Sequence, residues 1–123
     1  MVRHPIISTA LVALALTILS GVASPPARSA ELVMYFSENC EYSAIFDIEV
    51  APNYPKSAIG RVAPLKRVSV EDKDAGGYRL SAPLTVTPTF VLVENGEELD
   101  RITGYPGRAY FGKLVRHLVK RHQ

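Results

Sequence analysis

The chain has 123 residues, which is enough for one domain with a single modest hydrophobic core. Its 14 basic and 12 acidic residues give a net charge of +2 at pH 7. Two of the basic residues, Arg3 and Arg28, precede Glu31, so the remaining chain has 12 basic residues against 12 acidic ones. This near-neutral balance gives no indication of a nucleic acid or an anionic membrane surface as a partner.

The first 30 residues predict a secretory signal peptide. A short basic start is followed by an uncharged apolar run over residues 6–19 and then by small residues. Cleavage is expected between Ala23 and Glu31, which leaves residues 31–123 as the exported domain. Because a membrane-spanning helix needs about 20 apolar residues, this run is short for one, and an uncleaved leader that anchors the chain is the alternative.

The domain begins with a predicted strand followed by a helix. Residues 31–36 are a nearly continuous apolar run, which is typical of a central strand covered on both faces. From Cys40 to about Pro52 the pattern is helical. Its apolar residues at spacings of three and four are Tyr42, Ile45, Phe46 and Val50.

Two further strands and a hairpin follow. Residues 65–70 alternate as a second strand, and a short helical or looped connection leads to a third strand over residues 86–93. The dipeptide Asn95-Gly96 predicts a two-residue hairpin turn, with residues 98–102 as the returning strand.

The last predicted element is a helix packed on the sheet. Pro106 suits its first turn. The apolar residues that repeat along it are Phe111, Leu114, Val115, Leu118 and Val119. The predicted order is therefore β-α-β-α-β-β-α, an α/β fold with a four-stranded mixed sheet and helices on both faces.

Cys40 is the only cysteine, and it stands at the first strand-to-helix turn. A thiol at a helix N-terminus faces unpaired backbone N–H groups and the positive end of the helix dipole, which favour the reactive thiolate. The flanking carboxylates of Glu38 and Glu41 favour the neutral thiol instead. The alternative to a reactive thiol is a small buried hydrophobic side chain, which is how a free cysteine commonly behaves.

The order of elements and three short motifs resemble the thioredoxin fold in its short form. The motifs are Phe36 to Ser43 around the cysteine, Thr87-Pro88 at the start of the third strand, and Gly104-Tyr105 before the last helix. Within that superfamily, the chain resembles the small exported SoxS-type proteins encoded with bacterial sulfur-oxidation systems. Counterparts of that group's other motifs are Tyr54-Pro55-Lys56 and Ala63-Pro64-Leu65.

The resemblance implies where a substrate would bind. It implies a cis peptide bond between Thr87 and Pro88 beside the sulfur, and an exposed Thr87 backbone on which an extended polypeptide can add as a short strand. Together with Gly104 and Tyr105, these residues form the implied substrate-binding groove. No cofactor is implied. The spacing of His117 and His122 on the last helix does not suit a metal site.

The chain departs from the dithiol thioredoxins at the position of their second cysteine, which is Ser43 here. A serine hydroxyl cannot carry out thiol exchange, so the implied catalytic pair is Cys40 with Ser43 as a hydrogen-bond donor. Met34 replaces the buried acid of many thioredoxins, and Asn39 replaces the tryptophan before the nucleophile.

Two functions follow from these residues. The first is a periplasmic monothiol oxidoreductase that exchanges with a disulfide or modified cysteine of a partner protein and is freed by an external thiol reductant. The second is a binding or regulatory module that has lost redox turnover. Neither function involves a nucleic acid or a metal.

Overall fold

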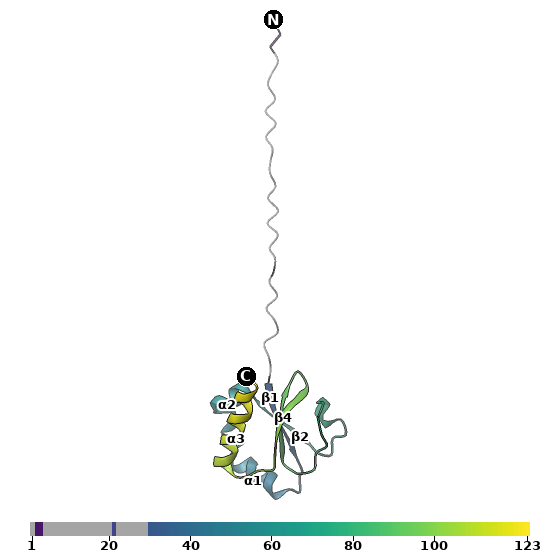
Figure 1. Ribbon diagram of the computed structural model, residues 1–123, viewed down its shortest axis with the longest axis vertical. Coiled ribbons are helices and arrows are strands. Elements are labelled where there is room, and N and C mark those ends of the chain that lie inside the picture. The colour runs from purple at the N-terminus through teal and green to yellow at the C-terminus, as the bar shows by residue number, and fades with distance from the viewer. Residues whose placement is uncertain (1, 4–20, 22–29) are drawn as a thin grey trace.

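The computed structural model of the protein describes residues 2–3, 21 and 30–123 (Figure 1). The predicted signal peptide lies almost entirely outside these residues. The elements in chain order are β1 (Ala30–Phe36), α1 (Glu41–Glu49), η1 (Tyr54–Lys56), α2 (Ala58–Val62), β2 (Leu65–Ser69), η2 (Ala75–Gly77), β3 (Thr89–Glu94), β4 (Glu97–Thr103) and α3 (Arg108–Arg121). Over the described part of the chain, every helix is too short or too polar to cross a membrane.

The four strands form one mixed sheet in the order β2-β1-β3-β4. Strand β1 is parallel to β2 and antiparallel to β3, which in turn is antiparallel to β4. Residues 32–35 of β1 are fully buried, as expected for a strand with neighbours on both edges and cover on both faces. The predicted mixed sheet, with a parallel pair followed by a hairpin, is confirmed.

The helices α1, α2 and α3 pack together with one face of the sheet (Figure 1). Phe46 of α1 is at the centre of this layer, with its ring centroid 4.7 Å from Phe90, 5.1 Å from Phe111 and 5.4 Å from Tyr105. Aromatic pairs at these separations stabilise packing beyond the area that they bury. This cluster fixes α1 against the sheet, and with it the position of Cys40 at the start of the helix.

The opposite face of the sheet is covered by the connection between β2 and β3. Val33, Tyr35, Val91 and Val93 pack there against apolar residues of β2 and of the segment that follows it. The only regular element in that segment is η2, a 3-10 turn of three residues. The helix expected on this face is therefore a single short turn, in a stretch that contains Gly76 and Gly77.

Three local expectations were wrong. Strand β3 begins at Thr89 rather than at residue 86, because Pro88 has no N–H to donate to a strand ladder. Helix α3 begins at Arg108, beyond Pro106, because Gly107 has φ 97°, which is outside the helical range. Tyr42 shares the helical spacing of the buried residues in α1, but its side chain is 59% exposed.

Candidate thiol site

Cys40 is the N-cap residue of α1. Its φ of −95° and ψ of 116° are extended, and its carbonyl accepts the first helical hydrogen bond from the backbone N–H of Ala44 at 3.1 Å. Its own N–H donates to the carbonyl of Ser37 at 3.1 Å, which closes the turn from β1. The side chain is partly exposed, so Cys40 is not the buried hydrophobic residue of the alternative interpretation.

Thr87 reaches the sulfur from a segment 47 residues further along the chain. The Cys40 Sγ donates a hydrogen bond to the Thr87 carbonyl oxygen at 3.2 Å. The peptide bond between Thr87 and Pro88 is cis. Beyond it, the Pro88 carbonyl accepts a hydrogen bond from the Gly104 N–H at 2.8 Å. The loop beside the sulfur is therefore held to the start of the segment that leads into α3.

The surroundings lower the pKa of the Cys40 thiol. The Thr87 side chain makes the largest contribution and favours the thiolate. Burial opposes it, and the Ser43 hydroxyl and the backbone at Ser43 and Tyr42 add to the lowering. The Thr87 carbonyl acts in the other direction because it accepts the thiol proton. The lowering contributions together exceed the effect of burial, so the thiolate is favoured relative to an unperturbed thiol.

Ser43, at the position of the second cysteine of dithiol thioredoxins, lies inside the first turn of α1. Its side chain is only 2% exposed. Among the residues that the structure describes, its Oγ is the one buried side-chain polar atom with no hydrogen-bond partner. Because the same hydroxyl contributes to the lowered pKa of Cys40, we expect the ionised sulfur to become its acceptor.

A shallow groove of about 290 Å³ lies beside Thr87. It brings together three of the predicted substrate-binding residues, Thr87, Gly104 and Tyr105, while Pro88 is buried and does not line it. Its other lining residues are Tyr42 and Val86, which are 59% and 43% exposed. Sequence reasoning missed both, although Tyr42 stands two residues after the cysteine.

Tyr105 lines this groove and is held in place by burial and by a hydrogen bond. It is 8% exposed, and its hydroxyl donates to Glu49 Oε2 at 2.5 Å. Burial, and then the carboxylate of Glu49, raise the pKa of Tyr105 far above the neutral range. The phenol therefore stays protonated and keeps its donor position.

Side chains of the kinds that bind metal ions do not cluster in the described part of the chain. There, no three side chains of the His, Cys, Asp or Glu types come close enough together to hold a metal ion. The site consists of one thiol, hydroxyl and backbone donors, and a small apolar groove.

A half-exposed thiol at a helix start, beside a cis-proline loop on a four-stranded mixed sheet, defines a protein of the thioredoxin class. The chain is 37% identical to the periplasmic thioredoxin SoxS from Paracoccus pantotrophus, whose structure was solved in the reduced form. The match covers 76% of this chain and 99% of that chain, with a TM-score of 0.73. The chain therefore belongs to the thioredoxin-like superfamily, with SoxS as a relative.

More distant structures share the fold alone. Fasciola hepatica thioredoxin matches with 24% identity and a TM-score of 0.55, over 76% of this chain and 81% of its own. A malaria parasite thioredoxin-2 matches with 15% identity and a TM-score of 0.53, over 73% of this chain and 84% of its own. No protein-family model and no curated protein matches the chain. Membership of the superfamily supports thiol–disulfide exchange as the general chemistry.

Proposed function

We propose that the protein is an exported monothiol oxidoreductase in which Cys40 exchanges with a disulfide of a partner protein. The observation that carries this proposal is the thiol itself, which is partly exposed and has a lowered pKa in a chain with no second cysteine. A thiolate is the form that attacks a disulfide.

The reaction takes place in three exchanges. The Cys40 thiolate attacks one sulfur of the partner's disulfide, a Cys40–partner bond forms, and the other sulfur leaves with the electron pair as a thiolate. An external thiolate then attacks the Cys40 sulfur and releases the partner's second thiolate. A second external thiolate frees Cys40, so one disulfide is reduced while two external thiols are oxidised to one disulfide.

The other site residues assist this exchange. The Ser43 hydroxyl donates to the sulfur whenever it carries negative charge, in attack and in release. Thr87 aligns the substrate backbone beside the sulfur, with Pro88 setting the course of the loop. Gly104 and Tyr105 line the groove for the neighbouring side chain of the substrate.

The similarity to SoxS and the predicted signal peptide support a proposal for the location and the partner of the protein. SoxS is a periplasmic thioredoxin, which together with the predicted signal peptide supports a periplasmic protein. The resemblance to SoxS-type proteins favours a partner of a sulfur-oxidation system with a disulfide or a modified cysteine. Strand β1 begins at Ala30, so cleavage before that residue would leave the strand complete.

Turnover of a peptide mixed disulfide tests the proposal. The substrate is a cysteine peptide joined to 2-mercaptoethanol, with 2-mercaptoethanol in excess as the reductant, and the released peptide thiol is measured. We expect many turnovers for each protein molecule and the uncatalysed rate for Cys40→Ser. If Cys40→Ser kept the full rate, the proposal would be wrong.

A binding or regulatory module is the second candidate, and Ser43 in place of a resolving cysteine favours it. In that case Cys40 captures one equivalent of substrate and excess thiol does not release it. The same assay separates the two functions, because the module keeps the captured peptide on Cys40 and releases no peptide thiol beyond the uncatalysed rate.

A further inference from the structure

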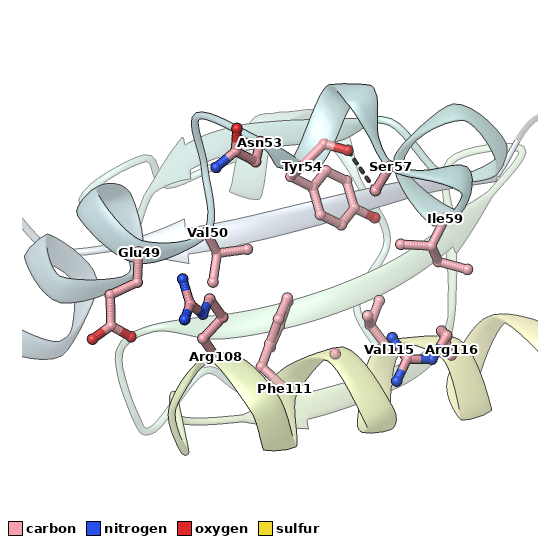
Figure 2. A pocket seen from close by; sticks show the side chains of 11 residues that line it. Glu49, Val50, Asn53, Tyr54, Ser57, Ile59, Arg108, Phe111, Val115 and Arg116 are labelled. Atoms are coloured by element: carbon pink, nitrogen blue, oxygen red, sulfur yellow. Dashed lines mark hydrogen bonds between the residues drawn. The ribbon is translucent and has the colours of Figure 1, made fainter.

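A second groove, of about 260 Å³, lies between α3 and residues 49–59 (Figure 2). Its apolar lining consists of Val50, Ile59, Phe111 and Val115. It shares no lining residue with the groove beside Thr87. The proposed exchange reaction does not use it.

Two arginines of α3 stand along the edge of this groove. Arg108 lies on the Val50 side and Arg116 on the Ile59 side (Figure 2). Both are exposed, and among the residues that the structure describes neither guanidinium has a hydrogen-bond or ion-pair partner. An apolar surface with an unpaired arginine at each end suits a ligand with an apolar centre and negative ends.

Gly112 lines the groove between the two arginines. It lies four residues from each of them, within α3, where glycine costs about 1 kcal/mol relative to alanine. Its φ is not positive, so the backbone does not require glycine there. A Cβ at this position would lie 3.2 Å from Nη1 of Arg116. The glycine therefore weakens the helix and leaves room for the Arg116 guanidinium at the edge of the groove.

Glu49 is the one acidic lining residue. Its Oε2 accepts the hydrogen bond from the Tyr105 hydroxyl, so this carboxylate already has a partner. With two arginines and one glutamate, the groove keeps a net positive charge.

The spacing of the two arginines along α3 is close to the spacing of alternate side chains on one face of an extended peptide. Eight residues of helix at about 1.5 Å each separate the Cα atoms of Arg108 and Arg116 by about 12 Å along the axis. The Arg116 guanidinium folds back over Gly112 in the structure, and its flexible side chain has to extend to reach this spacing. In an extended chain, residues i, i+2 and i+4 point to one face, and about 3.3 Å per residue places the outer two about 13 Å apart. The groove, of about 260 Å³, has room for one large side chain.

We propose that this groove docks an extended segment of a partner protein in which an apolar residue is flanked, two positions away on each side, by acidic residues. The apolar side chain enters between Phe111 and Ile59. The two carboxylates pair with Arg108 and Arg116. The partner is then held by a second surface that is independent of the thiol.

The test uses the peptide acetyl-Gly-Glu-Gly-Phe-Gly-Glu-Gly-amide, titrated into the full protein and followed by backbone amide NMR. We expect saturable shifts at Phe111, Gly112 and Val115. A peptide with lysine at both acidic positions is expected to bind at least tenfold more weakly. If the lysine peptide binds equally well, the proposal is overturned.

Variants of α3 test the roles of the two arginines and of Gly112. The double variant Arg108→Glu, Arg116→Glu is expected to bind the peptide at least tenfold more weakly. The double variant Lys113→Glu, Lys120→Glu, which makes the same charge change at two exposed positions of α3 outside the groove lining, is expected to bind it normally. Gly112→Ala is expected to raise the melting temperature and yet to weaken binding at least fivefold. A loss of binding without a gain in stability, or unchanged binding, would overturn the role of Gly112.

The same spectra distinguish the proposed peptide segment from two alternative occupants of the groove. If decanoate shifts these signals and the peptide does not, the groove takes a small anion and the proposal fails. If the signals move with protein concentration in the absence of peptide, a second copy of the chain occupies the groove and the proposal also fails.

Discussion

Replacement of Ser43 by alanine tests the buried hydroxyl beside Cys40. The side chain is 2% exposed, and its Oγ has no hydrogen-bond partner among the described residues. Burial of a hydroxyl without a partner costs about 1–3 kcal/mol, and a small cavity offsets part of the gain from its removal. While Cys40 is protonated, we expect Ser43→Ala to raise the free energy of unfolding by about 1 kcal/mol.

The effect should reverse when Cys40 ionises. The pKa of Cys40 is lowered in the folded protein, so its ionisation contributes stability that is fully present above the unfolded value of about 8.5 and is lost as the pH falls through the folded value. A hydrogen bond to a charged group contributes about 1.5–3 kcal/mol, and partial exposure of Cys40 places this one at the lower end. At about pH 9.5 the alanine variant should therefore be slightly less stable than the wild type.

Urea unfolding of both proteins at about pH 5.5 and pH 9.5, with a reductant present, measures this reversal. The control is the same substitution in a Cys40→Ala background, where the difference in stability should no longer depend on pH. If Ser43→Ala destabilises the protein at the lower pH, the hydroxyl has a partner in the neutral state. If the difference is constant with pH, the hydroxyl does not stabilise the thiolate.

Three further predictions concern the thiol, the core and one glycine. The rate of Cys40 alkylation by iodoacetamide should rise with a midpoint below about pH 8.5, and a midpoint at or above that value would contradict the lowered pKa. Phe46→Ala should cost about 3–5 kcal/mol in urea unfolding, because the ring is fully buried among aromatic side chains; a loss under about 1 kcal/mol would show that the cluster does not fix α1. Gly60→Ala should cost about 3 kcal/mol or more, since its Cβ would lie 1.8 Å from the Tyr54 carbonyl oxygen, and unchanged thermal stability would refute this contact.

Local patterns predicted the elements well. The apolar run of β1, the Asn95-Gly96 turn and the stripe of α3 each depend on near neighbours in the chain, and all three appear in the structure. In the turn, Asn95 and Gly96 have φ of 53° and 78°, the left-handed conformation that this dipeptide adopts readily. The element boundaries were less predictable because they depend on single residues such as Pro88 and Gly107.

The sequence alone also placed the single thiol at a helix start and indicated the superfamily, because capping position and motif order are properties of the chain itself. It did not show that Ser43 is buried without a partner, that the Thr87 carbonyl lies 3.2 Å from the sulfur, or that Tyr42 faces a groove. Those features, and the arginine-edged groove of α3, come from contacts between segments that are far apart in sequence. These features depend on how α1 and α3 pack together with the sheet. The spacing of apolar residues along a helix does not determine them, since the same spacing is compatible with a buried or an exposed side chain.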